Sequence, residues 1–200
     1  MNMPPNAPPN SAPLKVVLRL AAAAVGLLGV SILGLMGYYQ LNADAIDSEL
    51  YLSRGTWNFH RGDYAQAIEA LDQAVALNPA NAPAYLIRGD THLQLGEFRA
   101  AAADYTTLID AGLVHEDIYT GRGQARLELG ESAAAVADFT EALALNPYFA
   151  PAYYGRALAY EQAGDAESAR GDYAAFLELY FVNDERRADA RVRLNLLEGR

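Results

Sequence analysis

The chain has 200 residues, no cysteine and a formal net charge of −10 at pH 7. Without cysteine it has no disulfide framework, no thiol nucleophile and no thiolate metal site. Lys15 and Arg19 are the only charged residues before Asp44, so the remainder carries 13 basic and 25 acidic residues, a charge of −12. Because nucleic-acid phosphates need a basic surface, we expect no nucleic-acid partner.

The first two segments of the chain differ sharply in composition. Met1–Pro13 is uncharged and rich in proline and asparagine, which is typical of a disordered tail. Leu14–Leu41 has no charged side chain between Leu20 and Gly37. It is longer than the roughly 20 residues that span a bilayer. We therefore predict one transmembrane helix over residues 14–41.

The charges that flank this stretch predict its orientation. Lys15 and Arg19 lie on its N-terminal side, whereas acidic residues follow it at positions 44, 47 and 49. The positive-inside rule then places the N-terminus in the cytoplasm and the rest of the chain outside, and we expect a single-pass protein of a bacterial plasma membrane. The alternative is a signal peptide cleaved near Ala45, which would release a secreted protein.

Three small residues, Ala22, Gly26 and Gly34, lie within the predicted transmembrane helix. Small residues at such spacing let a second transmembrane helix pack closely, although glycine is also common in membrane helices without this role. Residues 42–47 form a linker of only a few residues before the rest of the chain. The domain that follows is therefore expected at the surface of the lipid bilayer, within reach of partners located there.

One constant period runs through the remainder of the chain. Four residue types repeat in the same register: Gly62, Gly96, Gly130 and Gly164; Tyr51, Tyr85, Tyr119 and Tyr153; Arg54, Arg88, Arg122 and Arg156; Ala67, Ala101, Ala135 and Ala169. Within one period, Glu116–Phe149, apolar residues at helical spacing indicate two short helices joined by a turn at Gly130. Gly123 and Ala135 let these helices approach closely, and Phe139 fills the space beside them. Such a pair leaves one flank uncovered and needs copies of itself as neighbours.

These ladders resemble the tetratricopeptide repeat family, whose repeating unit is a helix-turn-helix of the same length as this period. The resemblance covers Ser48–Phe181 and implies an all-α fold, a right-handed α-solenoid preceded here by the transmembrane helix. The four repeats occupy 48–81, 82–115, 116–149 and 150–183. The second repeat departs from the pattern, because it ends in Asp110–Leu113 rather than in Leu-Asn-Pro, and Leu108 stands where the first and third repeats have alanine. We expect a local change of packing between the second and third repeats.

Residues 184–200 are predicted to form a C-terminal capping helix. Ala188, Val192 and Leu196 form one apolar row, with Leu197 beside it. We expect this row to cover the flank of the last repeat, while four arginines of the same helix, at positions 186, 187, 191 and 193, remain in water.

Arginine and aspartate recur together at a constant separation in three of the repeats. The pairs are Arg88 with Asp104, Arg122 with Asp138, and Arg156 with Asp172. A planar guanidinium can donate two parallel hydrogen bonds to a carboxylate, so we predict three structural ion pairs between the helices of a repeat. The alternative is a solvated arginine that contributes only ~0–1 kcal/mol. The first repeat has Ala70 instead of the aspartate, so Arg54 pairs elsewhere, for example with Glu69, or stays solvated.

The sequence contains no pattern typical of a catalytic or metal site. His60, His92 and His115 are not accompanied by an HExxH or GxSxG motif, a Walker-type loop or a carboxylate pair. A metal site needs three or four convergent ligands. We therefore predict no enzyme activity, cofactor, bound metal or small-molecule substrate.

The family resemblance implies a binding groove, because in this family the inward side of each first helix lines one. Carried over by register, the groove residues are Glu49, Leu52, Thr56, Phe59 and His60; Leu86, Asp90, Leu93 and Gln94; Asp117, Thr120, Gln124, Leu127 and Glu128; Tyr154, Leu158, Glu161 and Gln162. None is Lys, Arg or Asn, the residues with which relatives hold a C-terminal carboxylate, so that activity is not expected. The mixture of apolar anchors and acids suits a helical or extended protein segment that carries apolar and some basic residues. For each position the alternative role is packing between repeats or plain exposure.

Two functions follow as hypotheses. The first is a membrane-tethered protein–protein interaction module, a scaffold or assembly factor that binds a partner segment in the groove. The second is a structural accessory subunit of a membrane protein complex, held mainly by its transmembrane helix. Exchangeable partners in a mild-detergent pull-down favour the first function, and fixed stoichiometry favours the second.

Overall fold

The computed structural model describes residues 35–38, 43–182 and 184–199. The chain divides into two compact units, Met1–Ile46 and Asp47–Arg200. In the first unit, residues 35–38 and 43–46 are helical. Among all described residues, no helix combines the length and the apolar character needed to cross a membrane.

Two sequence predictions fall outside the described residues. One is the tail Met1–Pro13. The other is the transmembrane stretch Leu14–Leu41 with its packing positions Ala22, Gly26 and Gly34, of which the structure describes only residues 35–38. Both therefore remain predictions.

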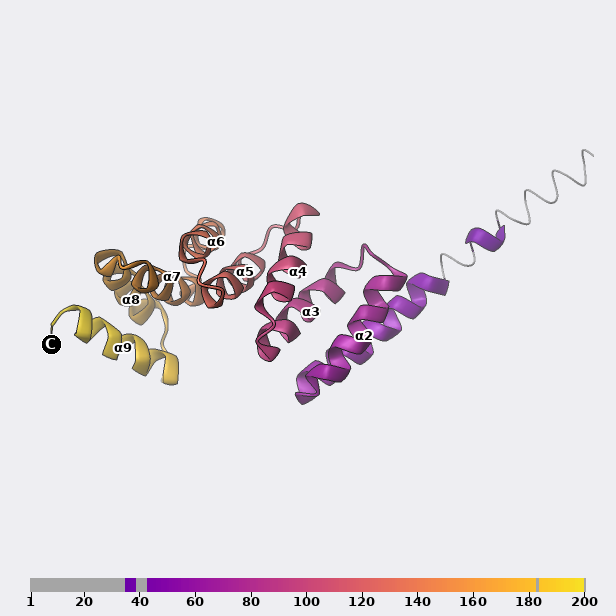
Figure 1. Cartoon of the computed structure of the whole chain (residues 1–200), viewed down its shortest axis with the longest axis horizontal. Coiled ribbons are helices and arrows are strands. Elements are labelled where there is room, and N and C mark those ends of the chain that lie inside the picture. Colours follow the sequence, from indigo (N-terminus) through magenta and orange to yellow (C-terminus); the bar gives the residue numbers. More distant parts are fainter. Residues whose placement is uncertain (1–34, 39–42, 183, 200) are drawn as a thin grey trace, which may run out of the picture. The chain divides into compact units, whose positions relative to one another are not determined.

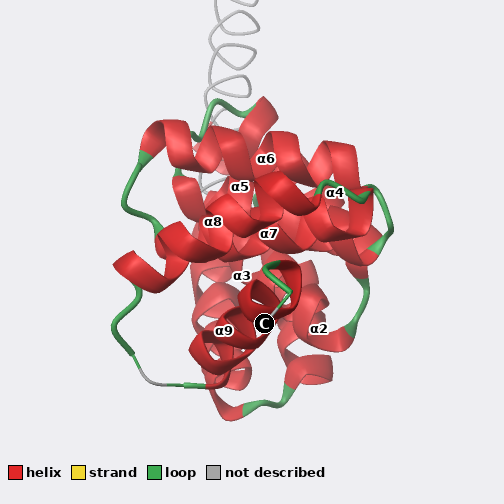
Figure 2. Ribbon diagram, turned by 90° about the vertical axis from the view of Figure 1, so that its left-hand side faces the viewer, coloured by secondary structure: helices red, strands yellow, loops and turns green. Residues whose placement is uncertain are grey.

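The second unit consists of helices that follow one another in chain order from α2 to α9 (Figure 1). The first helices of the repeats are residues 47–61, α3 (Ala82–Leu95), α5 (Glu116–Glu128) and α7 (Ala150–Ala163). The second helices are α2 (Tyr64–Leu77), α4 (Phe98–Asp110), α6 (Ser132–Leu145) and α8 (Ala166–Leu179), and α9 (Glu185–Leu197) follows them. Loops join these helices, and no strand occurs in the described part of the chain (Figure 2).

The glycine ladder forms the turn inside each repeat. Gly62, Gly96, Gly130 and Gly164 have φ angles of 80°, 73°, 78° and 82°. A side chain resists this left-handed conformation, so glycine ends each first helix at the same place in the period. The turn predicted at Gly130 is present in all four repeats.

One bulky residue per repeat, at the wedge position, fills the space between the helices. The wedge residues are Leu71, Tyr105, Phe139 and Tyr173, which recur at the repeat period and are all at most 1% exposed. Tyr105 packs against Gly89 of its own repeat and Gly121 of the next, and a Cβ added at Gly121 would lie 2.5 Å from the tyrosine ring. Phe139 has the same relation to Gly123 and Gly155. Small residues on two successive first helices thus make room for one ring between them.

The junction between the second and third repeats differs from the others, as the sequence predicts. Helices α2 and α6 end at Asn78 and Asn146, both in extended conformation. Helix α4 instead ends in a left-handed turn at Gly112, where the Leu113 amide donates to the Leu108 carbonyl. The altered path leaves an apolar cavity of about 230 Å³ lined by Ala82, Pro83, Leu86, Leu108, Leu113 and Ile118. The helix pairs continue on both sides of it, so the change is local.

The structure contains all three predicted Arg–Asp pairs. Arg88 donates to both oxygens of Asp104 at 2.9 and 2.7 Å, Arg122 to Asp138 at 3.1 and 2.7 Å, and Arg156 to Asp172 at 2.7 and 2.8 Å. The three aspartates are at most 7% exposed. Hydrogen bonding to its aspartate raises the pKa of Arg88 and that of Arg156. These are buried, two-pronged ion pairs rather than solvated rim charges.

Each of these arginines also contacts the preceding repeat. Its remaining nitrogen donates to a residue on the second helix of that repeat: Arg88 to Asp72 at 2.7 Å, Arg122 to Thr106 at 3.3 Å, and Arg156 to Thr140 at 3.2 Å. Each guanidinium further lies over the tyrosine that begins the same turn of helix, with 5.2–5.7 Å between the guanidinium carbon and the ring centre. One arginine therefore connects three helices of two repeats. Arg54, by contrast, is exposed and forms no ion pair with Glu69 or any other described residue.

The capping helix α9 uses a different face from the predicted one. Ala190 is fully buried, and Leu194 and Leu197 pack beside it against the cluster around Tyr173 and Phe176. The predicted row of Ala188, Val192 and Leu196 is exposed instead.

The predicted solvation of the capping-helix arginines was also wrong for two of them. Arg187 donates to the carbonyls of Leu177 and Tyr180. Arg193 bonds Glu161 at 2.9 Å and Asp189 at 2.6 Å. These polar contacts select the buried face, because the helix carries two apolar rows of similar hydrophobicity.

Candidate functional site

Two adjoining pockets lie along the first helices α3, α5 and α7, and together they form what we call the first-helix groove. The acidic pocket, about 420 Å³, is lined by Phe59, Leu86, Asp90, Leu93, Gln94, Tyr105, Asp117, Thr120, Gly121 and Gln124. The apolar pocket, about 180 Å³, is lined by Thr120, Gln124, Leu127, Glu128, Phe139, Pro151, Tyr154, Gly155, Leu158 and Arg186. Thr120 and Gln124 on α5 belong to both, so the pockets share a wall.

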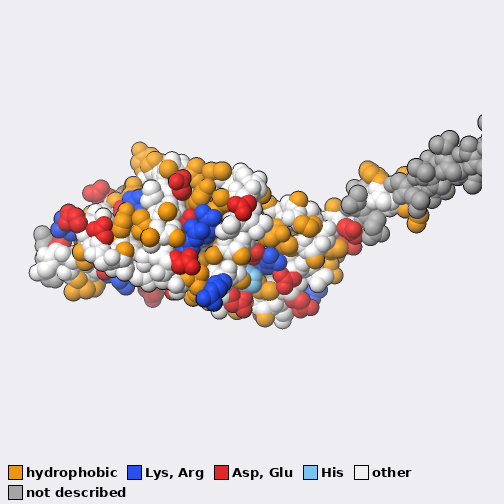
Figure 3. Space-filling view, turned by 45° about the horizontal axis from the view of Figure 1, so that its top comes forward, with side chains coloured by type: hydrophobic (Ala, Val, Ile, Leu, Met, Phe, Trp, Pro, Cys, Tyr) orange, Lys and Arg blue, Asp and Glu red, His pale blue; other side chains and the backbone are white. Residues whose placement is uncertain are grey.

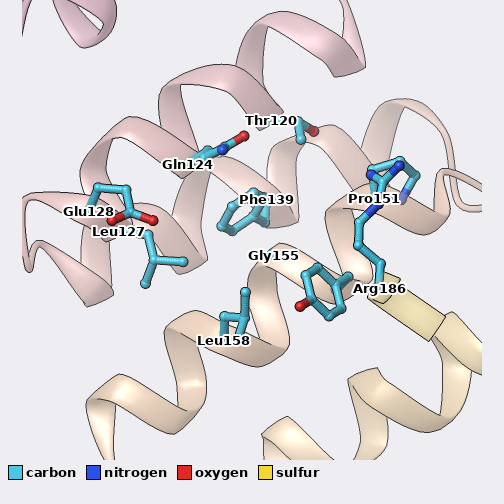
Figure 4. A pocket seen from close by; sticks show the side chains of 10 residues that line it. Thr120, Gln124, Leu127, Glu128, Phe139, Pro151, Gly155, Leu158 and Arg186 are labelled. Atoms are coloured by element: carbon cyan, nitrogen blue, oxygen red, sulfur yellow. The ribbon is translucent and has the colours of Figure 1, made fainter. Parts of the chain in front are cut away.

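A wedge residue contributes to the lining of each pocket. Tyr105 from α4 reaches the acidic pocket beside Gly121, and Phe139 from α6 reaches the apolar pocket beside Gly155. Figure 4 shows the Phe139 ring between the α5 side chains and the glycine of α7. The packing that joins consecutive repeats therefore also shapes the surface that the groove presents.

The acidic pocket contains two carboxylates and no lysine or arginine among its lining residues. Asp90 accepts a hydrogen bond of 2.5 Å from the hydroxyl of Tyr105, whose ring is fully buried. Burial raises the pKa of Asp90 above its ordinary value of 3.8; the bond from Tyr105 opposes this rise, and the charge of Asp117 adds to it. Burial and the charge of Asp90 likewise raise the pKa of the Tyr105 hydroxyl, which keeps its proton and remains a donor.

The apolar pocket has a hydrophobic floor and two charged residues of opposite sign. Leu127, Leu158 and the buried ring of Phe139 line it, together with Glu128 on α5 and Arg186 on α9 (Figure 4). Arg186 is weakly bound, at 3.3 Å from the Tyr180 hydroxyl and 3.9 Å from Asp184. The two charges balance, so this pocket favours apolar side chains without a preference for sign.

Thr120 is unusual among the lining residues. Its hydroxyl is the buried side-chain polar atom for which the described part of the chain provides no hydrogen-bond partner. Buried hydroxyls are normally satisfied, and one without a partner loses stabilisation that a ligand can restore. This hydroxyl belongs to the wall between the two pockets.

Twelve of the eighteen predicted groove residues line these pockets. They are Phe59, Leu86, Asp90, Leu93, Gln94, Asp117, Thr120, Gln124, Leu127, Glu128, Tyr154 and Leu158. The other six do not line them. Leu52 packs on the core of the first repeat, Thr56 is half-buried and His60 is exposed beside the Phe59 ring. Glu49 accepts a hydrogen bond from Asn81, Glu161 from Tyr173 and Arg193, and Gln162 from Ser132.

Several lining residues were not among the predicted ones. Tyr105 and Phe139 lie on second helices, which the register rule omits, and Gly121, Pro151 and Gly155 have little or no side chain to signal a role. The signal for the two aromatic residues was the ladder of wedge residues, in which Tyr105 and Phe139 each face a glycine in the next repeat. Arg186 belongs to α9, which stands at the first-helix position of a fifth period.

The histidines do not assemble a catalytic or metal centre. His92 contacts Glu97 at 2.6 Å, and His115 contacts Glu116 and Asp117 at 3.6 and 3.4 Å. Among the described residues, no group of three or more His, Cys, Asp or Glu side chains is placed to hold a metal ion.

Comparison with known proteins agrees with the helical period. Models of the tetratricopeptide repeat match residues 58–96, 82–111 and 120–184. No curated protein matches the sequence.

Solved structures are similar in fold. MamA protein is 22% identical with a TM-score of 0.68, and the match covers 76% of this chain and 81% of that one. YrrB, described as a TPR protein with an unusual peptide-binding site, is 19% identical with a TM-score of 0.63, covering 74% and 75%. The first TPR of Spaghetti (RPAP3), bound to the HSP90 peptide SRMEEVD, is 29% identical with a TM-score of 0.53, covering 58% and 93%.

The helix pairs, the turn glycines and these matches lead to one assignment. From Asp47 onward, the chain is a solenoid of tetratricopeptide repeats, an interaction module of the kind that binds peptides or proteins.

Proposed function

We propose that this chain is a membrane-tethered scaffold or assembly factor that binds a segment of a partner protein in the first-helix groove. The observation that carries the proposal is the pair of adjoining pockets along α3, α5 and α7. Their walls combine apolar side chains with a few polar groups, the composition usual for a site that holds a peptide.

The side chain of Gln124 illustrates why the groove is available to a partner. It lies on the wall shared by both pockets, is exposed, and forms no hydrogen bond with a described side chain. Two similar solved structures support the same use of this surface. YrrB is described as having an unusual peptide-binding site, and the RPAP3 repeat is bound to a peptide. Nothing in the packing of the repeats requires Gln124, so the position is free for recognition.

The membrane tether in this proposal rests on the sequence of Leu14–Leu41 and on the short segment 42–47 that follows it. Fusing a reporter that is active only in the cytoplasm to the C-terminus of the chain tests the orientation. We expect no reporter activity in intact cells, and strong activity contradicts the extracytoplasmic placement of the repeats.

The second candidate is an accessory subunit of a membrane protein complex. It is favoured by the small residues Ala22, Gly26 and Gly34, which suit close packing with another transmembrane helix. Variants in which these residues are replaced by leucine release the partner if this candidate holds, and retain it if the groove is the binding site.

The groove is tested by affinity capture with the full chain in mild detergent. Gln124→Arg places a long cationic side chain across both pockets and should abolish partner recovery. Ala144→Arg introduces an arginine at an exposed position on the second helix α6 and should leave recovery unchanged. Equal recovery with both variants contradicts binding in the first-helix groove.

A further inference from the structure

The charges of the solenoid are matched internally almost everywhere that they are buried. Asp104, Asp138 and Asp172 each bind an arginine of the same repeat. Near the end of the solenoid, Arg193 binds both Glu161 and Asp189. On the face seen in Figure 3, the basic side chains lie close to acidic ones.

The acidic pocket is an exception to this pattern. Asp90 is half-buried, and the group that it bonds there is the neutral hydroxyl of Tyr105. Asp117 lines the same pocket and contacts His115, at 3.4 Å. A half-buried carboxylate beside a second one is unfavourable, because burial and like charge both disfavour its ionised form. A cation placed between Asp90 and Asp117 would offset both the cost of burying the carboxylate and the repulsion between the two carboxylates.

The neighbouring pocket needs a different group. Its floor is formed by Phe139, Leu127 and Leu158, and its charges, Glu128 and Arg186, compensate each other. Aliphatic or aromatic side chains gain most from such a surface. The unpartnered hydroxyl of Thr120 belongs to the wall that the two pockets share.

We infer that the partner segment carries a lysine or arginine side chain that enters the acidic pocket between Asp90 and Asp117, next to an aliphatic or aromatic side chain that enters the apolar pocket. The inference rests on the proposed function and specifies the chemistry of its ligand. It excludes acidic peptides, because carboxylates would meet the like charge of Asp90 and Asp117. In this respect the groove differs from the RPAP3 repeat, whose bound peptide SRMEEVD carries two glutamates and a C-terminal aspartate.

Selection from a library of random short peptides tests the inference without knowledge of the natural partner. The full chain in mild detergent serves as the target. We expect selected peptides to combine lysine or arginine with a neighbouring aliphatic or aromatic residue. The double variant Asp90→Asn, Asp117→Asn should bind them about tenfold more weakly. The matched double variant Asp110→Asn, Glu141→Gln removes two exposed acids of second helices and should leave their affinity unchanged.

Failure of the inference and failure of the proposed function have different signatures. If the selected peptides are acidic or neutral, and if they bind Gln124→Arg more weakly than the unmodified chain, the inference is wrong but the groove remains the binding site. Peptides whose affinity is the same for Gln124→Arg and for Ala144→Arg bind elsewhere and overturn both. A selection that enriches no peptide also contradicts both, since the groove would then hold no peptide segment.

Discussion

The two polar faces of the first helices differ in how their charges are satisfied. On the face toward the second helices, Arg88, Arg122 and Arg156 are each bonded to a buried aspartate and to the preceding repeat. On the groove face, Asp90 and Asp117 meet in a pocket whose lining residues include no lysine or arginine. The charges of the first face form ion pairs that stabilise the fold, so their loss reduces stability. By our proposal Asp90 and Asp117 bind a basic side chain of a partner, so their loss is expected to reduce binding.

The largest expected effect concerns the fourth repeat. Arg156→Ala leaves Asp172 buried without its ionic partner and should lower the free energy of unfolding by roughly 3–5 kcal/mol. Arg54→Ala removes an exposed arginine of the same ladder that forms no ion pair with a described residue, and should change stability by no more than about 0.5 kcal/mol. Urea unfolding followed by circular dichroism measures both. Similar midpoints for the two variants would show that the buried pairs do not stabilise the fold.

The third repeat should be less sensitive. Asp138 is also bound by Arg126, at 2.7 Å, so Arg122→Ala leaves the carboxylate with one cation. We expect a loss of about 1.5–3 kcal/mol, the cost of charged hydrogen bonds rather than of an unpaired buried charge. The double variant Arg122→Ala, Arg126→Ala should then match Arg156→Ala. If the single variant is already as unstable as Arg156→Ala, Arg126 provides no compensation.

The groove face is probed by pH. Asp90 must be ionised to attract a basic side chain, and burial and Asp117 raise its pKa above 3.8. Affinity for a lysine-containing peptide should therefore rise, by up to about tenfold, as pH increases from acid through the pKa of Asp90. Fluorescence anisotropy across this range measures the change. Asp90→Asn should flatten the profile, whereas a profile that stays equally steep assigns it to Asp117 or its contact His115.

The smallest effect is expected where the two faces meet. Tyr105→Phe keeps the wedge ring, as Phe139 does in the next repeat, but removes the hydroxyl that donates to Asp90. Stability should fall by only about 0.5–1.5 kcal/mol. Because that hydrogen bond lowers the pKa of Asp90, its removal should shift the pH profile of peptide binding toward higher pH. An unshifted profile would show that the hydroxyl of Tyr105 does not influence peptide binding through Asp90.

The fold was predictable because each feature that defines it recurs. Gly62 and its three equivalents give the turns, and Ala67 and its equivalents give the close helix contacts. The arginines and the aspartates each recur at the repeat period, and this shared spacing also predicted the Arg–Asp pairs. The second acceptor of each arginine was not predicted, because it is an aspartate in one repeat and threonine in the next two, and a changing residue type hides the position.

The candidate site and the cap were less predictable for two physical reasons. A register rule that selects one side of the first helices cannot include Tyr105 or Phe139, which reach the pockets from second helices through the space left by glycine. In α9, the rows that begin at Ala188 and Ala190 are both apolar, and hydrophobicity alone does not choose between them. The choice was made by Arg193 and Asp189, through contacts with residues of α7 that are distant in the sequence.

Helix α9 is not followed by a second helix among the described residues. We therefore expect it to separate from the solenoid more readily than the helices that precede it. It rests on the cluster around Tyr173 and Phe176 and is held by polar contacts to Tyr154 and Glu161. A helix packed on only one side separates at lower free energy than helices enclosed between neighbours. Undocking of α9 would withdraw Arg186 from the apolar pocket and remove Arg193 from the carboxylate of Glu161. Undocking of α9 would therefore turn this end of the groove from charge-balanced to acidic, which links the charge offered to a partner to the docking of α9.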